Sequence, residues 1–157
     1  MTTGTNIKSV RLILDSNLED VFLVGLAIRG ICSYVPLGEV AAYQVEVCVV
    51  EAVNNAIKHA YGNEAGHRVE ICVEVRLDRI VFEVCDDGAE LGNFPKMSGR
   101  KDFDPEDLEN IPEGGMGLQI IYSVMDEVTY ARTDRGNVLR MSKSYGPDRC
   151  ASAGEPK

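Results

Sequence analysis

The sequence predicts an α+β fold, a two-layer sandwich in which helices cover one face of a mixed, largely antiparallel sheet. Two observations lead to this prediction. Stretches with an apolar residue at every third or fourth position are separated by shorter stretches in which every second residue is apolar. Most of the short stretches come in pairs joined by a tight turn, which favours antiparallel strands. At 157 residues, the chain is long enough for one domain with its own apolar core.

The first two elements are a strand and a helix. Residues 7–14 alternate as a strand does, and residues 15–17 offer side-chain oxygens that can cap a following helix. That helix is expected over residues 18–34, before Pro36 and Gly38 interrupt it. Its apolar stripe consists of Val21, Val24, Ile28 and Ile31.

The next segment, residues 39–61, contains no Gly or Pro and is expected to be one long helix. Glu51, Asn55 and His59 follow one another at steps of four, so they drift only about 40° per step and share one flank of the helix. An ordinary polar face is one explanation. The other is a site in which Asn55 gives its carbonyl oxygen to a hard cation and Glu51 orients a nucleophile.

The remaining regular elements are two hairpins and a short helix. Residues 68–76 and 80–85 are expected to form strands with one buried and one solvated face. A short helix is expected over residues 116–125. Strands at 127–134 and 137–145 complete the second hairpin.

A long segment between these elements, residues 87–115, is rich in glycine, proline and charge, with a weak helical turn at 105–109. A loop of this length inside a compact domain is normally functional or disordered. The predicted domain spans residues 7–145, and residues 1–6 and 146–157 are expected to be flexible termini.

Two more motifs border this loop. Asp86 ends an apolar strand and Gly88 follows it, which is a common turn signal but also places a carboxylate where it can accept a hydrogen bond from an exocyclic amine. Gly114, Gly115 and Gly117 surround the start of the next helix. They are either a flexible hinge or a place where the backbone approaches an anion closely, with the free amides of the helix pointing at it.

The net charge of −9 argues against binding to nucleic acid or to an anionic membrane, and it is compatible with a basic protein partner. The five cysteines are odd in number and form no CxxC pair, which indicates buried apolar residues in a reducing compartment. No apolar run approaches the length that spans a bilayer, and the first residues lack the apolar region of a signal peptide. We therefore expect a cytoplasmic protein.

The three motifs occur in an order that resembles the GHKL ATP-binding superfamily: a helical EXXXN, a strand-end DXG, a long loop, and GGXGL opening a helix. Within it, the segments EAVNNAIKHAY, PEGGMGLQII, MDEVTY and GNVLRM resemble the anti-sigma-factor serine/threonine kinases of bacterial stress and sporulation control. The resemblance covers about residues 10–144 and implies the Bergerat-type ATP-binding fold.

The resemblance implies a role for each motif residue. It assigns Asn55 to Mg²⁺ and Glu51 to activation of the attacking hydroxyl, while Asp86 would contact the adenine amine and Gly88 would give the base room. His59 matches the motif's histidine and is expected to orient the helix or support the site indirectly.

For the phosphates, the resemblance implies a cradle made of the glycines and of the amides near the helix start. Its members are Gly114, Gly115, Met116, Gly117 and Leu118. Residues 91–113 would form the ATP lid.

The chain departs from the family pattern at two places. The family usually has DXGXG, and Glu90 replaces the second glycine here, which puts ATP turnover in doubt. The late threonine that many members use near adenine has no clear counterpart, and Thr129 and Thr133 are the nearby candidates.

The implied function is that of an ATP-dependent serine/threonine protein kinase that acts as an anti-sigma factor. It would phosphorylate an anti-sigma-factor antagonist and sequester a sigma factor, and homodimers are typical of the family. A complete sensor histidine kinase is not expected, because no helical hairpin with a phosphoacceptor histidine is present. The alternatives are a nucleotide-dependent protein-binding regulator without kinase activity and a signalling kinase that serves no sigma factor.

Overall fold

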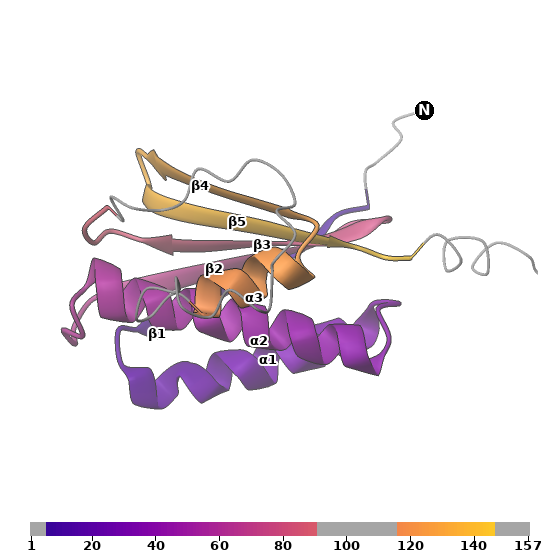
Figure 1. The fold of residues 1–157 in the computed structure, drawn as a ribbon, viewed down its shortest axis with the longest axis horizontal. Helices are drawn as coiled ribbons and strands as arrows, with labels where there is room; N and C mark the ends of the chain where they lie inside the picture. The colour runs from indigo at the N-terminus through magenta and orange to yellow at the C-terminus, as the bar shows by residue number, and fades with distance from the viewer. Residues whose placement is uncertain (1–5, 91–115, 147–157) are drawn as a thin grey trace, which may run out of the picture.

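The computed structural model describes residues 6–90 and 116–146, and it consists of a sheet with helices on one face (Figure 1). The elements are, in order, β1 (Lys8–Asp15), a 3-10 turn (Leu18–Asp20), α1 (Val21–Tyr34), α2 (Glu39–Asn55), a π-helical turn (Ala56–Ala60), β2 (Arg68–Val75), β3 (Arg79–Asp86), α3 (Met116–Val124), β4 (Glu127–Thr133) and β5 (Gly136–Ser144). The predicted weak turn at 105–109 lies outside the described residues.

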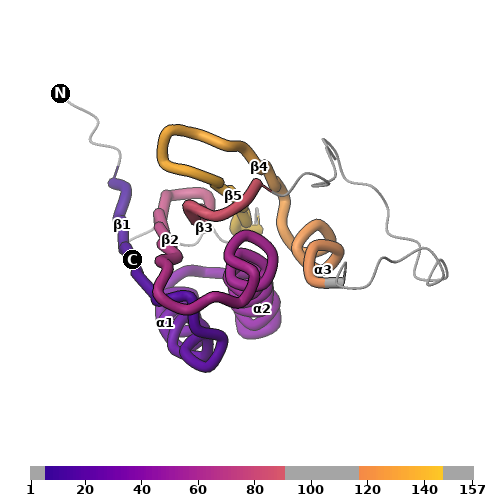
Figure 2. The backbone as a smooth tube through the Cα atoms, turned by 90° about the vertical axis from the view of Figure 1, so that its left-hand side faces the viewer, coloured from indigo at the N-terminus to yellow at the C-terminus, as the bar shows by residue number. Residues whose placement is uncertain are grey.

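The five strands form one sheet in the order β1-β2-β3-β5-β4. All four pairings are antiparallel, so the described sheet is more uniform than the mixed sheet expected from sequence. Seen from the end in Figure 2, α1 lies under β1 and β2, α2 under β3 and β5, and α3 beside β4. The predicted α+β sandwich is therefore confirmed.

The segment from β1 to α1 forms as its pattern predicts. On β1, only the helix-facing Leu12 and Leu14 pack against the core, because this strand is an edge of the sheet. Asn17 caps the following turn by accepting a hydrogen bond from the Glu19 amide at 3.1 Å. The turn starts as a 3-10 helix, and α1 then buries Val21, Val24 and Ile28.

The long central helix has the predicted extent but changes its geometry near the end. Up to Asn55 it is α-helical, with a buried stripe between the sheet and the other helices. Its last turn is π-helical, and the Tyr61 amide donates to the Ala56 carbonyl at 3.2 Å. A π turn holds more residues than an α turn, so side-chain positions extrapolated from 3.6 residues per turn no longer apply at His59.

The core lies between the two layers, and β3 runs through its centre. The expectation of one buried and one solvated face is wrong for β3, because Val81 and Cys85 are buried on the face away from the helices. β3 is the central strand of the sheet and is flanked by β2 and β5. The largest fully buried side chains include Ile28, Ile57, Ile71, Ile80, Phe82, Ile121 and Met141.

The second hairpin needs a glycine for two reasons. Gly136 has φ of 90°, which favours glycine. A Cβ at this position would also overlap the carbonyl oxygen of Asp86. The start of β5 therefore lies directly against the end of β3. Among the described residues, no helix is long and apolar enough to span a membrane.

Candidate functional site

Three of the predicted motifs meet at one end of the domain, where α2 and β3 end and α3 begins (left in Figure 1). There a cavity of about 20 Å³, roughly enough for one water molecule, lies between the helices and the sheet. It is lined by Ala52, Asn55, Ala56, Val84, Asp86, Leu118, Tyr130 and Leu139. Side chains far apart in sequence thus share one small cavity, to which Asn55 contributes a carboxamide and Asp86 a carboxylate.

The Asp86 carboxylate is held by two hydrogen bonds, both of them to Oδ1. The Gly88 amide donates at 3.0 Å, and the Asn137 side-chain Nδ2 donates at 2.8 Å. Burial raises the pKa of Asp86 above its usual value, and these two donors oppose the rise. The carboxylate is therefore both desolvated and oriented, as an acceptor for a buried ligand must be.

The segment after β3 packs against the end of the central helix. A Cβ at Gly88 would overlap the Ala60 carbonyl, and the Ala89 amide donates to that carbonyl at 2.9 Å. Tyr61 locks the same segment, because its hydroxyl accepts from the Asp87 amide at 2.8 Å and donates to the Arg68 carbonyl at 2.6 Å. Close packing against the helix thus gives a reason for Gly88 beyond leaving room for a base.

Glu51 lies against the first turn of α3. A Cβ at Gly117 would be 2.5 Å from Glu51 Oε2, so the glycine lets this carboxylate approach the start of the helix. Gly117 is buried and Glu51 is half-buried. Of the predicted phosphate cradle, Met116 begins α3 and Leu118 lines the cavity, while Gly114 and Gly115 lie outside the described residues, as does the predicted lid, 91–113.

Asn55 is only 9% exposed and lines the cavity one turn after Glu51. His59 belongs to the π-helical turn and is exposed, so the structure does not place it in the cavity with Asn55. Glu90, the departure from DXGXG, is exposed at the end of the described segment. No group of three His, Cys, Asp or Glu side chains that could hold a metal occurs in the described part of the chain.

Sequence reasoning missed the contribution of β4 and β5. Tyr130 lines the cavity, and Asn137 and Arg132 lie on the same face of the sheet, opposite one another in the strand register. Thr129 and Thr133 alternate with these residues, so they lie on the face without helices and neither can serve as the late threonine. The strand register places Asn137 opposite Asp86, and no local sequence signal predicts this pairing.

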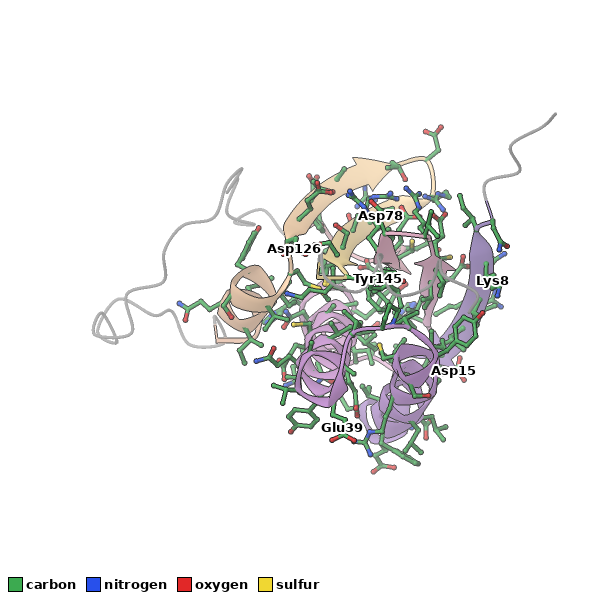
Figure 3. All side chains as sticks on the ribbon, turned by 90° about the vertical axis from the view of Figure 1, so that its right-hand side faces the viewer. Lys8, Asp15, Glu39, Asp78, Asp126 and Tyr145 are labelled. Carbon is green, nitrogen blue, oxygen red and sulfur yellow. The ribbon has the colours of Figure 1, made fainter. Side chains whose placement is uncertain are left out.

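A larger cavity, of about 460 Å³, lies at the opposite end of α2. This end faces the viewer in Figure 3, where Glu39 is labelled at the helix start. Arg29 and Glu46 line it and form a two-pronged ion pair, with nitrogen–oxygen distances of 2.9 and 3.0 Å. None of the predicted site residues is among the described residues that line it.

Comparisons with known proteins identify the family of this chain. Residues 14–143 match the family model of the histidine kinase-like ATPase domain. The serine-protein kinase RsbW of Staphylococcus epidermidis is 31% identical over 149 residues, which cover 93% of this chain and 92% of that protein. The protein of the same name from Bacillus licheniformis is 30% identical over 132 residues, covering 83% and 82%.

A solved structure is also similar, the histidine kinase domain from Erythrobacter litoralis EL346 blue-light activated histidine kinase. Its TM-score is 0.49 at 19% identity, with 88% of this chain and 65% of that chain covered. The family match extends over most of the chain, and the named relatives align along nearly their whole length. The protein therefore belongs to the histidine kinase-like ATPase domain family and, within it, to the serine-protein kinases.

Proposed function

We propose that this protein transfers the γ-phosphoryl group of ATP to a serine or threonine hydroxyl of a partner protein. The observation that carries the proposal is the convergence of Glu51, Asn55 and Asp86, with the Gly117 helix start, at one end of the domain. Phosphoryl transfer asks a protein mainly for positioning and for neutralisation of charge. The side chains of Glu51, Asn55 and Asp86 are suited to positioning, and the free amides at the start of α3 are suited to offsetting phosphate charge.

Asp86 is the proposed recognition group for the base. Because Oδ1 already accepts from Gly88 and Asn137, Oδ2 is the oxygen left to accept a hydrogen bond from the exocyclic amine of adenine. The apolar side chains Leu118 and Leu139 line the same cavity and supply surface for the ring. Binding requires the small cavity to widen around the base, since its volume fits only a water molecule.

Asn55 is the proposed protein ligand of Mg²⁺. Magnesium prefers oxygen ligands and is commonly held by one or two protein groups together with substrate phosphates and water. A single amide oxygen therefore fits the described site, which contains no cluster of carboxylates. When bound, the ion would neutralise phosphate charge, while Asn55 would only fix its position.

Glu51 is the proposed group that orients the attacking hydroxyl. It lies against Gly117, so it borders the start of α3, where the free amides and the helix dipole favour phosphate. Gly114, Gly115, Gly117 and the amides near Met116 and Leu118 form the proposed phosphate cradle. A half-buried carboxylate beside bound phosphates can accept the hydrogen bond of an incoming hydroxyl and direct it in line.

For partners, we propose an anti-sigma-factor antagonist as phosphoacceptor and a sigma factor as the sequestered protein, with transcription regulation as the outcome. Such partners place the proposed activity in the cytoplasm. The acidic chain, with a net charge of −9, suits a partner with a basic surface. Exposed apolar residues on α1, among them Phe22, Leu23 and Leu26, supply surface that a protein or a second copy of the chain can cover.

The test separates binding from transfer. Candidate antagonists are incubated with γ-labelled ATP and Mg²⁺, together with the wild type, Glu51→Gln or Asp86→Asn. Glu51→Gln keeps the size of the side chain against Gly117, so we expect nucleotide affinity within about twofold of wild type and transfer reduced by at least about 100-fold, the usual contribution of a positioned acid–base group. Asp86→Asn is expected to lose nucleotide affinity.

Three outcomes distinguish the alternatives. Label on a candidate antagonist that is present with the wild type and lost with Glu51→Gln supports the proposed kinase activity. Equal loss of nucleotide affinity in both variants contradicts the separate roles of the two carboxylates. Tight ATP binding without transfer to any candidate favours the binding regulator, and Glu90→Gly then tests whether the departure from DXGXG is the reason.

A further inference from the structure

We propose that Asn137, held in place by Arg132, orients the Asp86 carboxylate and thereby makes the site selective for a base with an exocyclic amine. Asn137 would then be a positioning residue that determines specificity. This inference rests on the proposed nucleotide-binding function, and it assigns a role to two residues of β4 and β5 to which the sequence analysis gave none.

Strand register brings the three side chains together. Asn137 on β5 is paired with Asp86 on β3 and with Arg132 on β4. All three therefore occupy the helix-covered face at the end of the sheet that carries the cavity. Asn137 is only 1% exposed, so its amide must find partners inside the protein.

Arg132 fixes which way the Asn137 amide points. The guanidinium Nη1 lies 3.1 Å from Asn137 Oδ1 and 3.2 Å from the Gly88 carbonyl. A guanidinium can only donate hydrogen bonds, so the amide oxygen faces Arg132 and the amide nitrogen faces Asp86. The reversed amide would place its two hydrogens against a cation and its oxygen against a carboxylate.

The amide nitrogen in turn fixes the carboxylate. Nδ2 lies 2.8 Å from Asp86 Oδ1, 3.0 Å from the Ala89 carbonyl and 3.2 Å from the Gly88 carbonyl. With the Gly88 amide also donating to Oδ1 at 3.0 Å, one carboxylate oxygen is held from two sides. Rotation of the carboxylate would break both bonds, so Oδ2 keeps one direction as a ligand acceptor.

Selectivity follows from the chemistry of the acceptor. A 6-amino purine donates a hydrogen bond to a fixed carboxylate oxygen, whereas a 6-oxo purine presents an acceptor and is repelled. For a purine without a substituent at position 6, the direction of the carboxylate does not change the binding affinity. Removing Asn137 must therefore weaken the 6-amino ligand selectively, because only that ligand uses the orientation that Asn137 provides.

The experiment is a cycle of two ligands and four proteins, read by calorimetric affinity in the absence of any phosphoacceptor. The ligands are ADP and the diphosphate of purine riboside, which lacks the 6-amino group. The proteins are wild type, Asn137→Leu, Asn137→Thr and Arg132→Met. Leucine has a similar size and no donor, and threonine keeps one hydroxyl donor.

We expect Asn137→Leu to weaken ADP binding by about 10-fold or more, the effect of losing a hydrogen bond to a charged group. The same variant should change the affinity for the desamino ligand by less than about threefold, because that ligand does not use the oriented oxygen. Asn137→Thr should recover part of the preference for ADP. Arg132→Met should shift the preference in the same direction as Asn137→Leu but less, because Asn137 remains.

Equal losses for the two ligands would overturn the inference, because a merely structural role weakens both. If Asn137→Leu does not fold, the Thr and Met variants decide by the same comparison. A wild type that binds neither ligand would instead overturn the proposed function. A wild type that binds ADP, with an unchanged ligand preference in every variant, overturns only the role of Asn137.

Discussion

At Asp86, the ionised form of the carboxylate that ligand binding needs is the form that lowers the stability of the folded protein. A ligand amine needs the ionised carboxylate, and partial burial raises the pKa of Asp86, which disfavours that form. The donors Asn137 and Gly88 offset part of this effect, and Arg132 contributes a favourable charge while Asp87 opposes it. Sequence patterns identified the carboxylate from its place at a strand end, but its donors come from another hairpin and carry no local signal.

Asp86→Asn is expected to raise the free energy of unfolding at neutral pH by up to about 2 kcal/mol, the usual size for single stabilising substitutions. In the folded protein the carboxyl pKa is raised, so its contribution to stability is full at low pH and is lost as pH rises through that pKa. The side-chain amide that Asp86→Asn introduces has no charge to desolvate, and its oxygen can still accept a hydrogen bond from Asn137.

Urea unfolding measured at neutral pH and again near about pH 4, where an ordinary Asp titrates, checks this expectation. The increase in the free energy of unfolding caused by Asp86→Asn should be present at neutral pH and smaller in acid. Asp87→Asn is the matched control, since its side chain belongs to an exposed residue next in sequence. A loss of stability at neutral pH in Asp86→Asn would contradict the prediction.

At the scale of elements, the site exists because three segments approach one another at glycines. Gly88 allows the end of β3 to touch the central helix, Gly136 allows β5 to touch β3, and Gly117 allows α3 to touch Glu51. The sequence predicted all of these elements within a few residues. It did not predict that the last turn of the central helix is π-helical or that His59 is exposed, because a single π turn leaves no distinct pattern of apolar residues.

Gly136→Ala is expected to lower the free energy of unfolding by at least about 2 kcal/mol, since a positive φ alone costs roughly 1–2 kcal/mol in a residue with a Cβ. The new methyl group would also overlap the Asp86 carbonyl and displace the strand end that carries the carboxylate. Nucleotide affinity should therefore fall together with stability.

Gly62→Ala is the control for backbone strain alone. Its φ is 58°, and a Cβ there has no neighbour within 4 Å among the described residues. We expect Gly62→Ala to cost about 1–2 kcal/mol of stability and to leave nucleotide affinity unchanged. Equal effects of the two substitutions, measured by denaturant unfolding and by nucleotide binding, would show that the contact between β5 and β3 does not matter.

At the scale of the whole molecule, one continuous apolar core lies between the sheet and the helices. The four cysteines within the described residues are free, and Cys32, Cys48 and Cys85 are buried, as the sequence predicted, while Cys150 lies outside the described part. Burial raises the pKa of Cys48 to about 12 and that of Cys32 to about 11. Both thiols are therefore protonated and inaccessible near neutral pH.

Native-state labelling with a maleimide near neutral pH is expected to modify Cys32 and Cys48 only after unfolding, because the thiolate is the reactive form. Cys72 is only partly buried and should react at least about 10-fold faster, since local openings suffice to expose it. Peptide mass spectrometry over a time course gives the rates. Fast labelling of Cys32 or Cys48 without denaturant would contradict the described core.

The sequence by itself determined the helices, both hairpins, the buried stripe of the central helix and the positions of Glu51, Asn55 and Asp86, because periodicity, turn residues and capping are local. Only the tertiary structure decided that β5 lies between β3 and β4, and so that Asn137 and Arg132 stand beside Asp86. Strand order depends on which strands, distant in sequence, pair with one another, and this pairing depends on packing across the whole core. The pairing therefore determines which side chains surround Asp86.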